Sequence, residues 1–237
     1  MKIIILSLVK IKEKDVLVTA LSEEEVITFK AHGALSPNNK NAAINNILTI
    51  LDAEITTNKT GTKSLKECSV ISVPDFTSVD LNYMATINSI AEATNKMLDE
   101  EERHLAFPYL EKALYALKEA KYPLLVLIAY LAKLIKLSGG SFEINRCVAC
   151  GRKQNIVAFS FIDGGYICKD CLDDNTDLSL STYSLALIRT LCGTQDFNFN
   201  LVEYNEGEVL ILLKKFIIYI SDGIGVFIES PKLITSY

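Results

Sequence analysis

Four cysteines with paired spacing are the residues of this sequence best suited to chemistry. Cys147 and Cys150 form one C-x2-C pair, and Cys168 and Cys171 form a second pair after seventeen intervening residues. This spacing is typical of four-cysteine zinc sites, because each pair forms a tight turn that directs two sulfurs at one point. Four thiolates complete a tetrahedron and leave no open position for water or substrate. We therefore expect one structural Zn2+ per chain.

The residues between the two pairs favour a ribbon-like hairpin. Residues 156–162 are rich in β-formers, Asp163-Gly164-Gly165 is a turn sequence, and Tyr166-Ile167 can return as a second strand. A disulfide pair, an iron–sulfur cluster and unligated thiols remain alternatives. The disulfide is disfavoured because the apolar N-terminus has no cleavage site and soon meets charges, so no export signal is expected. Cys68 and Cys192 lack partner spacing and are interpreted as small buried hydrophobes.

Other polar motifs predict no catalysis. Gly61-Thr62-Lys63-Ser64 lacks the first glycine and the Gly-Lys pair of a phosphate loop, so it is interpreted as a surface turn. His32 and His104 are the only histidines, and neither lies in a nucleophile or metal motif. The acidic run 99–102 is interpreted as serving a helix N-terminus. We expect a protein that is not an enzyme.

Composition indicates a folded chain with a substantial core. Of 237 residues, 49% are hydrophobic. The longest apolar runs, 122–137 and 209–220, are shorter than the roughly 20 residues that cross a bilayer, so we interpret them as buried helices and expect no membrane association. The net charge of -5 disfavours a protein whose whole surface contacts nucleic acid. Any DNA surface must then be a local patch.

Hydrophobic patterning divides the chain into a β-rich start and a helical remainder. Short alternating runs predict five strands, at 3–10, 15–21, 26–32, 47–55 and 67–73, which suggest a small closed barrel of the oligonucleotide-binding (OB) fold. Helical periodicity then predicts helices over 81–98, 101–120, 123–138, 182–193 and 206–221. The expected fold class is α+β: an N-terminal five-stranded OB barrel followed by an all-helical domain with an inserted four-cysteine zinc module. The expected divisions are 1–76 for the barrel, 77–146 and 172–237 for the helical domain, and 147–171 for the zinc module.

This order of parts resembles the RecO family of bacterial DNA-repair proteins over essentially the whole length. Arg146-Cys147-Val148-Ala149-Cys150-Gly151 is similar to the family's passage at the first knuckle. Tyr219-Ile220, Gly225 and Ser230 are similar to its closing region, with Ile224 at a leucine position. The segment 30–40, where the family carries a basic stretch, has two Lys, one His and no Arg.

The resemblance implies a cytoplasmic, nucleoid-associated mediator of recombination. Such a protein binds single- and double-stranded DNA, anneals complementary strands and, with RecR, helps to load RecA on gaps coated with single-stranded DNA-binding protein. The barrel is the expected DNA surface, because residues 30–73 hold five Lys against three acidic residues. The candidate contacts are Lys30, Lys40, Lys59, Lys63 and Lys66; the alternative is that they form a solvated rim.

Two other function classes stay open. The first is a zinc-ribbon module in transcription or translation whose barrel contacts RNA or protein. The second is a zinc-stabilised enzyme that modifies nucleic acids, which would need convergent polar groups in a pocket.

Overall fold

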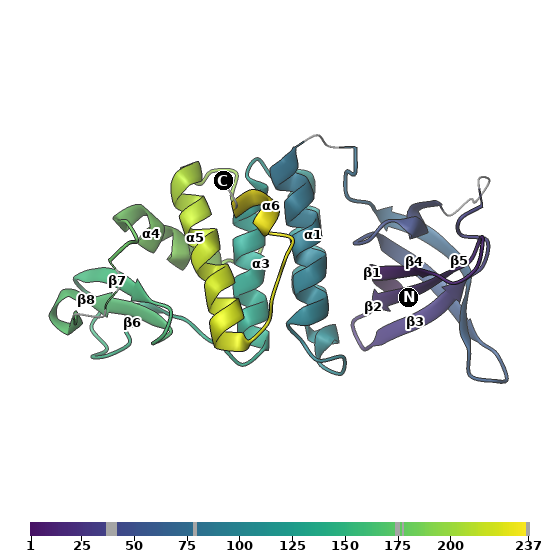
Figure 1. Cartoon of the computed structure of the whole chain (residues 1–237), viewed down its shortest axis with the longest axis horizontal. Helices are drawn as coiled ribbons and strands as arrows, with labels where there is room; N and C mark the ends of the chain where they lie inside the picture. Colours follow the sequence, from purple (N-terminus) through teal and green to yellow (C-terminus); the bar gives the residue numbers. More distant parts are fainter. Residues whose placement is uncertain (37–41, 78–79, 174–175, 177, 236–237) are drawn as a thin grey trace. The chain divides into compact units, whose positions relative to one another are not determined.

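A computed structural model describes residues 1–36, 42–77, 80–173, 176 and 178–235. The chain has the predicted α+β class, and its contacts divide it into two compact units (Figure 1). Unit 1 comprises Met1–Ser78 and Leu98–Lys118, and unit 2 comprises Val79–Met97 and Glu119–Tyr237. The segment 98–118 thus groups with the β-rich part rather than with the later helices. The division into four parts remains a prediction.

Unit 1 contains a closed five-stranded barrel, as the sequence predicts. Its strands are β1 (Lys2–Lys10), β2 (Val16–Leu21), β3 (Val26–Ala31), β4 (Ile50–Thr57) and β5 (Lys63–Ser72). They follow the order β1-β2-β3-β5-β4, with β4 closing on β1. A short 3-10 helix, η1 (Ala42–Asn45), precedes β4. Alternate residues of β2 and β3 point into the core, where Val18 and Phe29 are buried.

Two strand boundaries differ from the predicted ones. β4 begins three residues later than expected, because Leu48 has a left-handed φ of 57° and its N–H donates to the Ile5 carbonyl instead of continuing the ladder. β5 begins four residues earlier than expected. The turn before it is tight, since the Asn58 side chain accepts hydrogen bonds from the N–H groups of Thr60 and Thr62. The β4–β5 hairpin is therefore paired almost to its tip.

The predicted helix over 101–120 is wrong in its first turn. A 3-10 turn, η2 (Arg103–Ala106), is followed directly by α2 (Phe107–Lys118). Pro108 explains the break, because it has no N–H to continue α-helical bonding backward into residues 103–106. Within unit 1, α2 is tied to the barrel by an ion pair of 2.7 Å between Lys2 Nζ and Glu111 Oε1.

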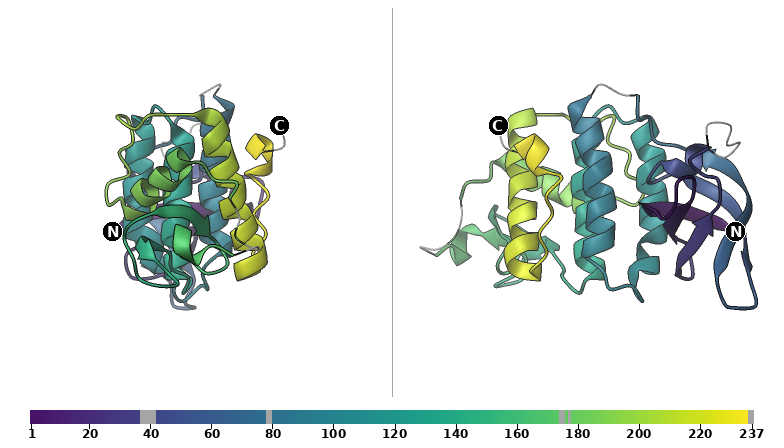
Figure 2. Two further views of the ribbon diagram at one scale, coloured as in Figure 1. Left: turned by 90° about the vertical axis from the view of Figure 1, so that its left-hand side faces the viewer. Right: turned by 45° about the vertical axis from the view of Figure 1, so that its right-hand side comes forward.

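Unit 2 is built on one buried helix. Its helices are α1 (Leu81–Lys96), α3 (Pro123–Leu137), α4 (Thr182–Gly193), α5 (Glu206–Tyr219) with a π-helical turn η4 (Ile220–Ile224), and α6 (Lys232–Thr235). Helices α1, α3 and α5 run side by side with α3 in the middle (Figure 1), and Figure 2 gives two further views of this unit. Residues 123–135 of α3 are all buried. Within the described residues, no helix has both the length and the apolar character to span a membrane.

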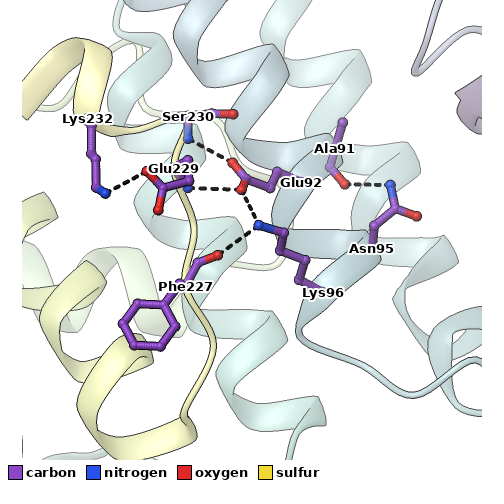
Figure 3. A network of polar contacts seen from close by, with 8 residues as sticks. All are labelled: Ala91, Glu92, Asn95, Lys96, Phe227, Glu229, Ser230 and Lys232. Atoms are coloured by element: carbon purple, nitrogen blue, oxygen red, sulfur yellow. Dashed lines mark hydrogen bonds and ion pairs between the residues drawn. The ribbon is translucent and has the colours of Figure 1, made fainter.

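Glu92 on α1 fastens the C-terminal segment to unit 2 (Figure 3). Its carboxylate accepts hydrogen bonds from the backbone N–H groups of Glu229 (2.9 Å) and Ser230 (2.7 Å) and from Lys96 Nζ (2.7 Å). Lys96 also donates to the Phe227 carbonyl. Burial alone would raise the pKa of Glu92, but these donors outweigh it and lower the pKa to about 2.

From these hydrogen bonds we predict that Glu92 makes a contribution to stability that is lost in acid. Because the folded pKa of Glu92 lies below the unfolded value, its contribution is present above about pH 4.5 and is lost as the pH falls toward 2. Glu92→Gln should lower the free energy of unfolding by about 1–3 kcal/mol at neutral pH. Urea titrations of both proteins should show this difference shrinking between pH 5 and pH 3. Exposed Glu100→Gln is the control, and an equal loss there would contradict the assignment.

Candidate metal centre and basic end of the barrel

The predicted cysteine module is a three-stranded sheet within unit 2. Its strands are β6 (Glu143–Cys147), β7 (Ile156–Ser160) and β8 (Gly165–Cys168), in the order β6-β8-β7, and the 3-10 turn η3 (Lys169–Cys171) follows. The antiparallel β7–β8 hairpin confirms the predicted ribbon. The sequence interpretation missed β6, which pairs with β8 in parallel. Each pair of cysteines thus begins at the end of a strand, Cys147 on β6 and Cys168 on β8.

The four predicted cysteines converge on one point. The sulfurs of Cys147, Cys150, Cys168 and Cys171 all lie within 4.8 Å of one another. The Cys150 and Cys168 sulfurs are 3.6 Å apart, which is too long for a disulfide. A tetrahedral ion with metal–sulfur bonds of ~2.3 Å would separate its ligands by about 3.8 Å. The donor set and its spacing therefore fit a tetrahedral metal ion held by four thiolates.

The thiols of the cluster ionise unequally when no cation lies among them. Burial alone would raise the pKa of Cys147, but backbone N–H groups of Cys168, Cys150 and Ala149 donate to its sulfur and lower the pKa to about 6. Hydrogen bonds with the Cys150 and Cys168 sulfurs instead raise the pKa of Cys171. A metal cation bound by the sulfurs would favour the thiolate form of all four.

Glycines allow the backbone to form this site. Gly151 follows the first pair with a φ of +75°, and its N–H donates to the Cys147 carbonyl, which closes the first turn. Gly165 lies where β8 meets β6. A Cβ there would lie 2.5 Å from Val148 Cγ1 and 2.7 Å from the Glu143 carbonyl oxygen. Only glycine permits this close parallel pairing.

A cluster of aromatic rings connects the cysteine module to α5. Phe142, at the start of the module, packs with its ring centroid 5.4 Å from that of Phe159 on β7 and 5.7 Å from that of Phe216 on α5. Phe161 contacts both Phe159 and Phe216, and Tyr219 packs on Phe142. Edge-to-face pairs of this kind add to the stability given by burial. The cysteine module therefore shares a core with the helices.

The lysines predicted to contact DNA lie in different environments. Lys30 is on the outward face of β3, and Lys59 is exposed in the β4–β5 turn. Lys63 and Lys66 are ion-paired, with Glu25 at 3.3 Å and Glu54 at 2.7 Å. Lys66 occupies a β-bulge, since Glu54 pairs with Glu67 and Ile55 pairs with Leu65. Lys40 lies outside the described residues.

Strand register places the lysines of the barrel relative to one another. Val9, Leu17, Lys30, Ser64 and Thr56 are successive pairing partners across β1, β2, β3, β5 and β4. Because β5 runs parallel to β3, the β1–β2 turn and the β4–β5 turn project from opposite sides of this row, and Lys63 pairs with Glu25 in the β2–β3 turn. Four lysines therefore lie at the end that carries the β1–β2 turn: Lys10, Lys12, Lys14 and Lys30. We call this surface the lysine end.

Acidic residues gather elsewhere on the barrel. On β4 and β5, Glu54 and Glu67 are direct cross-strand partners, and Asp52 pairs with Ser69 beside them. These residues line a shallow hollow of about 440 Å³ together with Met1 and Cys68. The N-terminal ammonium group lies 2.9 Å from Asp52 Oδ1 and offsets part of the charge. Lys66 faces this acidic side, which makes it the weakest of the described candidates for a phosphate contact.

Comparison with known families decides the affiliation of the chain. The family model for the C-terminal part of recombination protein O matches residues 78–219, which is more than half of the chain. The chain belongs to the RecO family. This match covers helices α1 to α5 and the four-cysteine module, so the RecO resemblance predicted from the order of these parts is confirmed.

Curated RecO proteins are similar to this chain over parts of their length. DNA repair protein RecO of a Thermoanaerobacter species is 33% identical over 94 residues, which is 39% of this chain and only 38% of that RecO protein. RecO of Halalkalibacterium halodurans is 25% identical over 72% of this chain and 67% of its own length. RecO of Bacillus pumilus is 27% identical over 75% of this chain and 70% of its own length.

Metal analysis should distinguish the four cysteines from the other two. We expect one zinc ion per chain, and Cys171→Ser should lose most of it because a three-sulfur site binds metal more weakly. Cys68→Ser is the matched control, since Cys68 lies on β5, outside the cluster. Elemental analysis by mass spectrometry measures both. Metal-free wild type, or equal metal loss in the control, would contradict the assignment.

Gly165→Ala should destabilise the cysteine module without removing a ligand. The added methyl group clashes with the Glu143 carbonyl oxygen, and this backbone atom cannot move away without separating β6 from β8. We expect a loss of about 1–3 kcal/mol in the free energy of unfolding. In urea titrations the control is Gly193→Ala, where the nearest atom, Ile144 Cδ1, lies at 3.8 Å. Equal unfolding midpoints for the two variants would show that the close approach is not a constraint.

Proposed function

We propose that this chain is a non-enzymatic DNA-repair and recombination mediator. The observation that carries the proposal is its membership of the RecO family through residues 78–219. Similar curated proteins are called DNA repair proteins. The proposed activity is binding of single- and double-stranded DNA followed by annealing of complementary strands. Its proposed partners are RecR, single-stranded DNA-binding protein and, indirectly, RecA, and its proposed place of action is the cytoplasm.

We assign the barrel to the OB fold and make it the main DNA surface. Five-stranded OB barrels bind oligonucleotides on the face of strands 2 and 3 and between the loops that join strands 1 to 2 and 4 to 5. In this chain the corresponding elements carry Lys30 on β3, Lys12 and Lys14 in the first loop, and Lys59 in the second. A barrel in which nine Lys balance nine acidic residues over 1–76 thus presents positive charge where the fold binds nucleic acid.

We assign the four-cysteine cluster to structural zinc. Four thiolates close the coordination sphere, so the ion would activate neither water nor substrate. The contribution of the metal is to hold β6, β8 and the two cysteine turns together, next to the rings that pack on α5. The zinc module would then support the helical unit rather than perform a reaction.

Strand annealing tests the proposed function directly. Purified protein should accelerate annealing of complementary oligonucleotides by at least tenfold over the spontaneous rate at low salt, and less at high salt because counterions compete for the phosphates. Fluorescence quenching between labelled strands measures the rate. Co-purification with RecR separates this role from an RNA- or protein-binding module in transcription or translation. An unchanged annealing rate together with no DNA binding would overturn the proposal, and turnover of the oligonucleotides would indicate an enzyme instead.

A further inference from the structure

The lysine end combines positive charge with a turn that the structure holds in place. The Asp15 carboxylate accepts a hydrogen bond from the Gly33 N–H (2.9 Å) and pairs with His32, and the Lys14 carbonyl accepts one from the Leu35 N–H (3.0 Å). These bonds fasten the β1–β2 turn to the segment after β3. The lysines on this turn are thus displayed on ordered backbone, which lowers the entropic cost of binding.

The ammonium groups at this end are available to a ligand. Among the residues that the structure describes, Lys10, Lys12, Lys14 and Lys30 form no ion pair, whereas Lys63, on the other side of the row, is paired with Glu25. The acidic residues on the β1–β2 turn are Glu13 and Asp15, and Asp15 is engaged by His32 and Gly33. Free lysines grouped on one surface are the usual footprint of a phosphate chain.

The same surface has no Phe, Tyr or Trp ring on which a base could stack. Residues 1–72 contain one such side chain, Phe29, which is only 1% exposed in the barrel core, and the ring of His32 is held against Asp15. The outward row across the strands consists of Val9, Leu17, Lys30, Ser64 and Thr56. OB folds that hold single strands through their bases rely on exposed aromatic faces. That source of affinity is missing from this barrel.

We propose that the lysine end binds the sugar–phosphate backbone alone and neither stacks on nor reads the bases. This inference rests on the proposed DNA binding and specifies its chemistry. Lys10, Lys12 and Lys14 on the β1–β2 turn supply the main contacts, and Lys30 on β3 extends them onto the sheet. A strand bound only through its phosphates keeps its base edges exposed, so a complementary strand can pair with it while it remains bound.

Binding to strands with and without bases tests the inference. The probes are labelled oligothymidylate and an abasic strand of equal length, with inorganic polyphosphate as competitor, each in a salt series followed by fluorescence anisotropy. We expect affinities for the two strands that agree within about threefold, because a single lost base stack would cost roughly fivefold or more. Polyphosphate should displace both strands.

Substitution of the turn lysines locates the site. Lys10→Ala, Lys12→Ala and Lys14→Ala combined should reduce the slope of log affinity against log salt by about two to three units and weaken binding equally for both strands. The control combines Lys136→Ala, Lys214→Ala and Lys232→Ala, three exposed lysines of unit 2, and removes the same net charge. An equal loss of slope in the control would overturn the proposed site.

The outcomes separate this inference from the proposed function. Wild-type protein that binds oligothymidylate but loses more than tenfold in affinity on the abasic strand would overturn the backbone-only mode and leave the DNA-binding role intact. Wild-type protein that binds neither strand would overturn the proposed function itself. Circular dichroism and urea titration of the triple variant should match wild type, since the three side chains are exposed and make no contact that supports the fold.

Discussion

Burial of helix α3 is the constraint on which the helical unit depends. Its residues from Pro123 to Ile135 are buried on every side, so α3 is stable only when other elements surround it. Helices α1, α4 and α5 supply that cover, and α3 contacts all three. The Tyr130 hydroxyl lies deep in this core and shares a hydrogen bond of 2.7 Å with Thr94 on α1, which satisfies both polar groups. The helices that surround α3 come from residues 81–96, before it in the chain, and from residues 182–219, after the cysteine module. The cysteine module must therefore end at a position from which α4 and α5 can pack on α3.

The cysteine module meets that requirement through two connections. Its aromatic rings pack against Phe216 and Tyr219 on α5, and the Tyr166 hydroxyl on β8 donates to the Leu185 carbonyl on α4. Both recipient helices lie on α3. A small sheet of three short strands buries little apolar surface by itself, so covalent or metal cross-links are the usual means of fixing its geometry. A metal ion held by the four sulfurs would therefore fix the strands that carry the rings as well as the two cysteine turns.

Sequence patterns predicted those features that depend on neighbouring residues. Alternation identified five barrel strands, and the spacing of Cys147, Cys150, Cys168 and Cys171 identified the cluster. Features that depend on distant segments were missed, or their boundaries were predicted at the wrong residues. Strand β6 pairs in parallel with β8, and its identity depends on the close approach at Gly165 rather than on its own composition. The bulge at Lys66 and its pairing with Glu54 follow from the register of β4 against β5, which no local pattern encodes.

The distribution of charge on the barrel explains how an acidic chain can present a basic surface. Cross-strand register decides which side chains become neighbours, so Lys30 lies beside the lysines of the β1–β2 turn while Glu54 and Glu67 lie together on another side. Like charges placed directly opposite each other on adjacent strands are unfavourable, and the ion pair between Glu54 and Lys66 reduces that cost locally. An approaching polyanion is repelled by the acidic side and attracted to the lysine end. Over distances shorter than the Debye length of about 8–10 Å, this local pattern outweighs the net charge of -5.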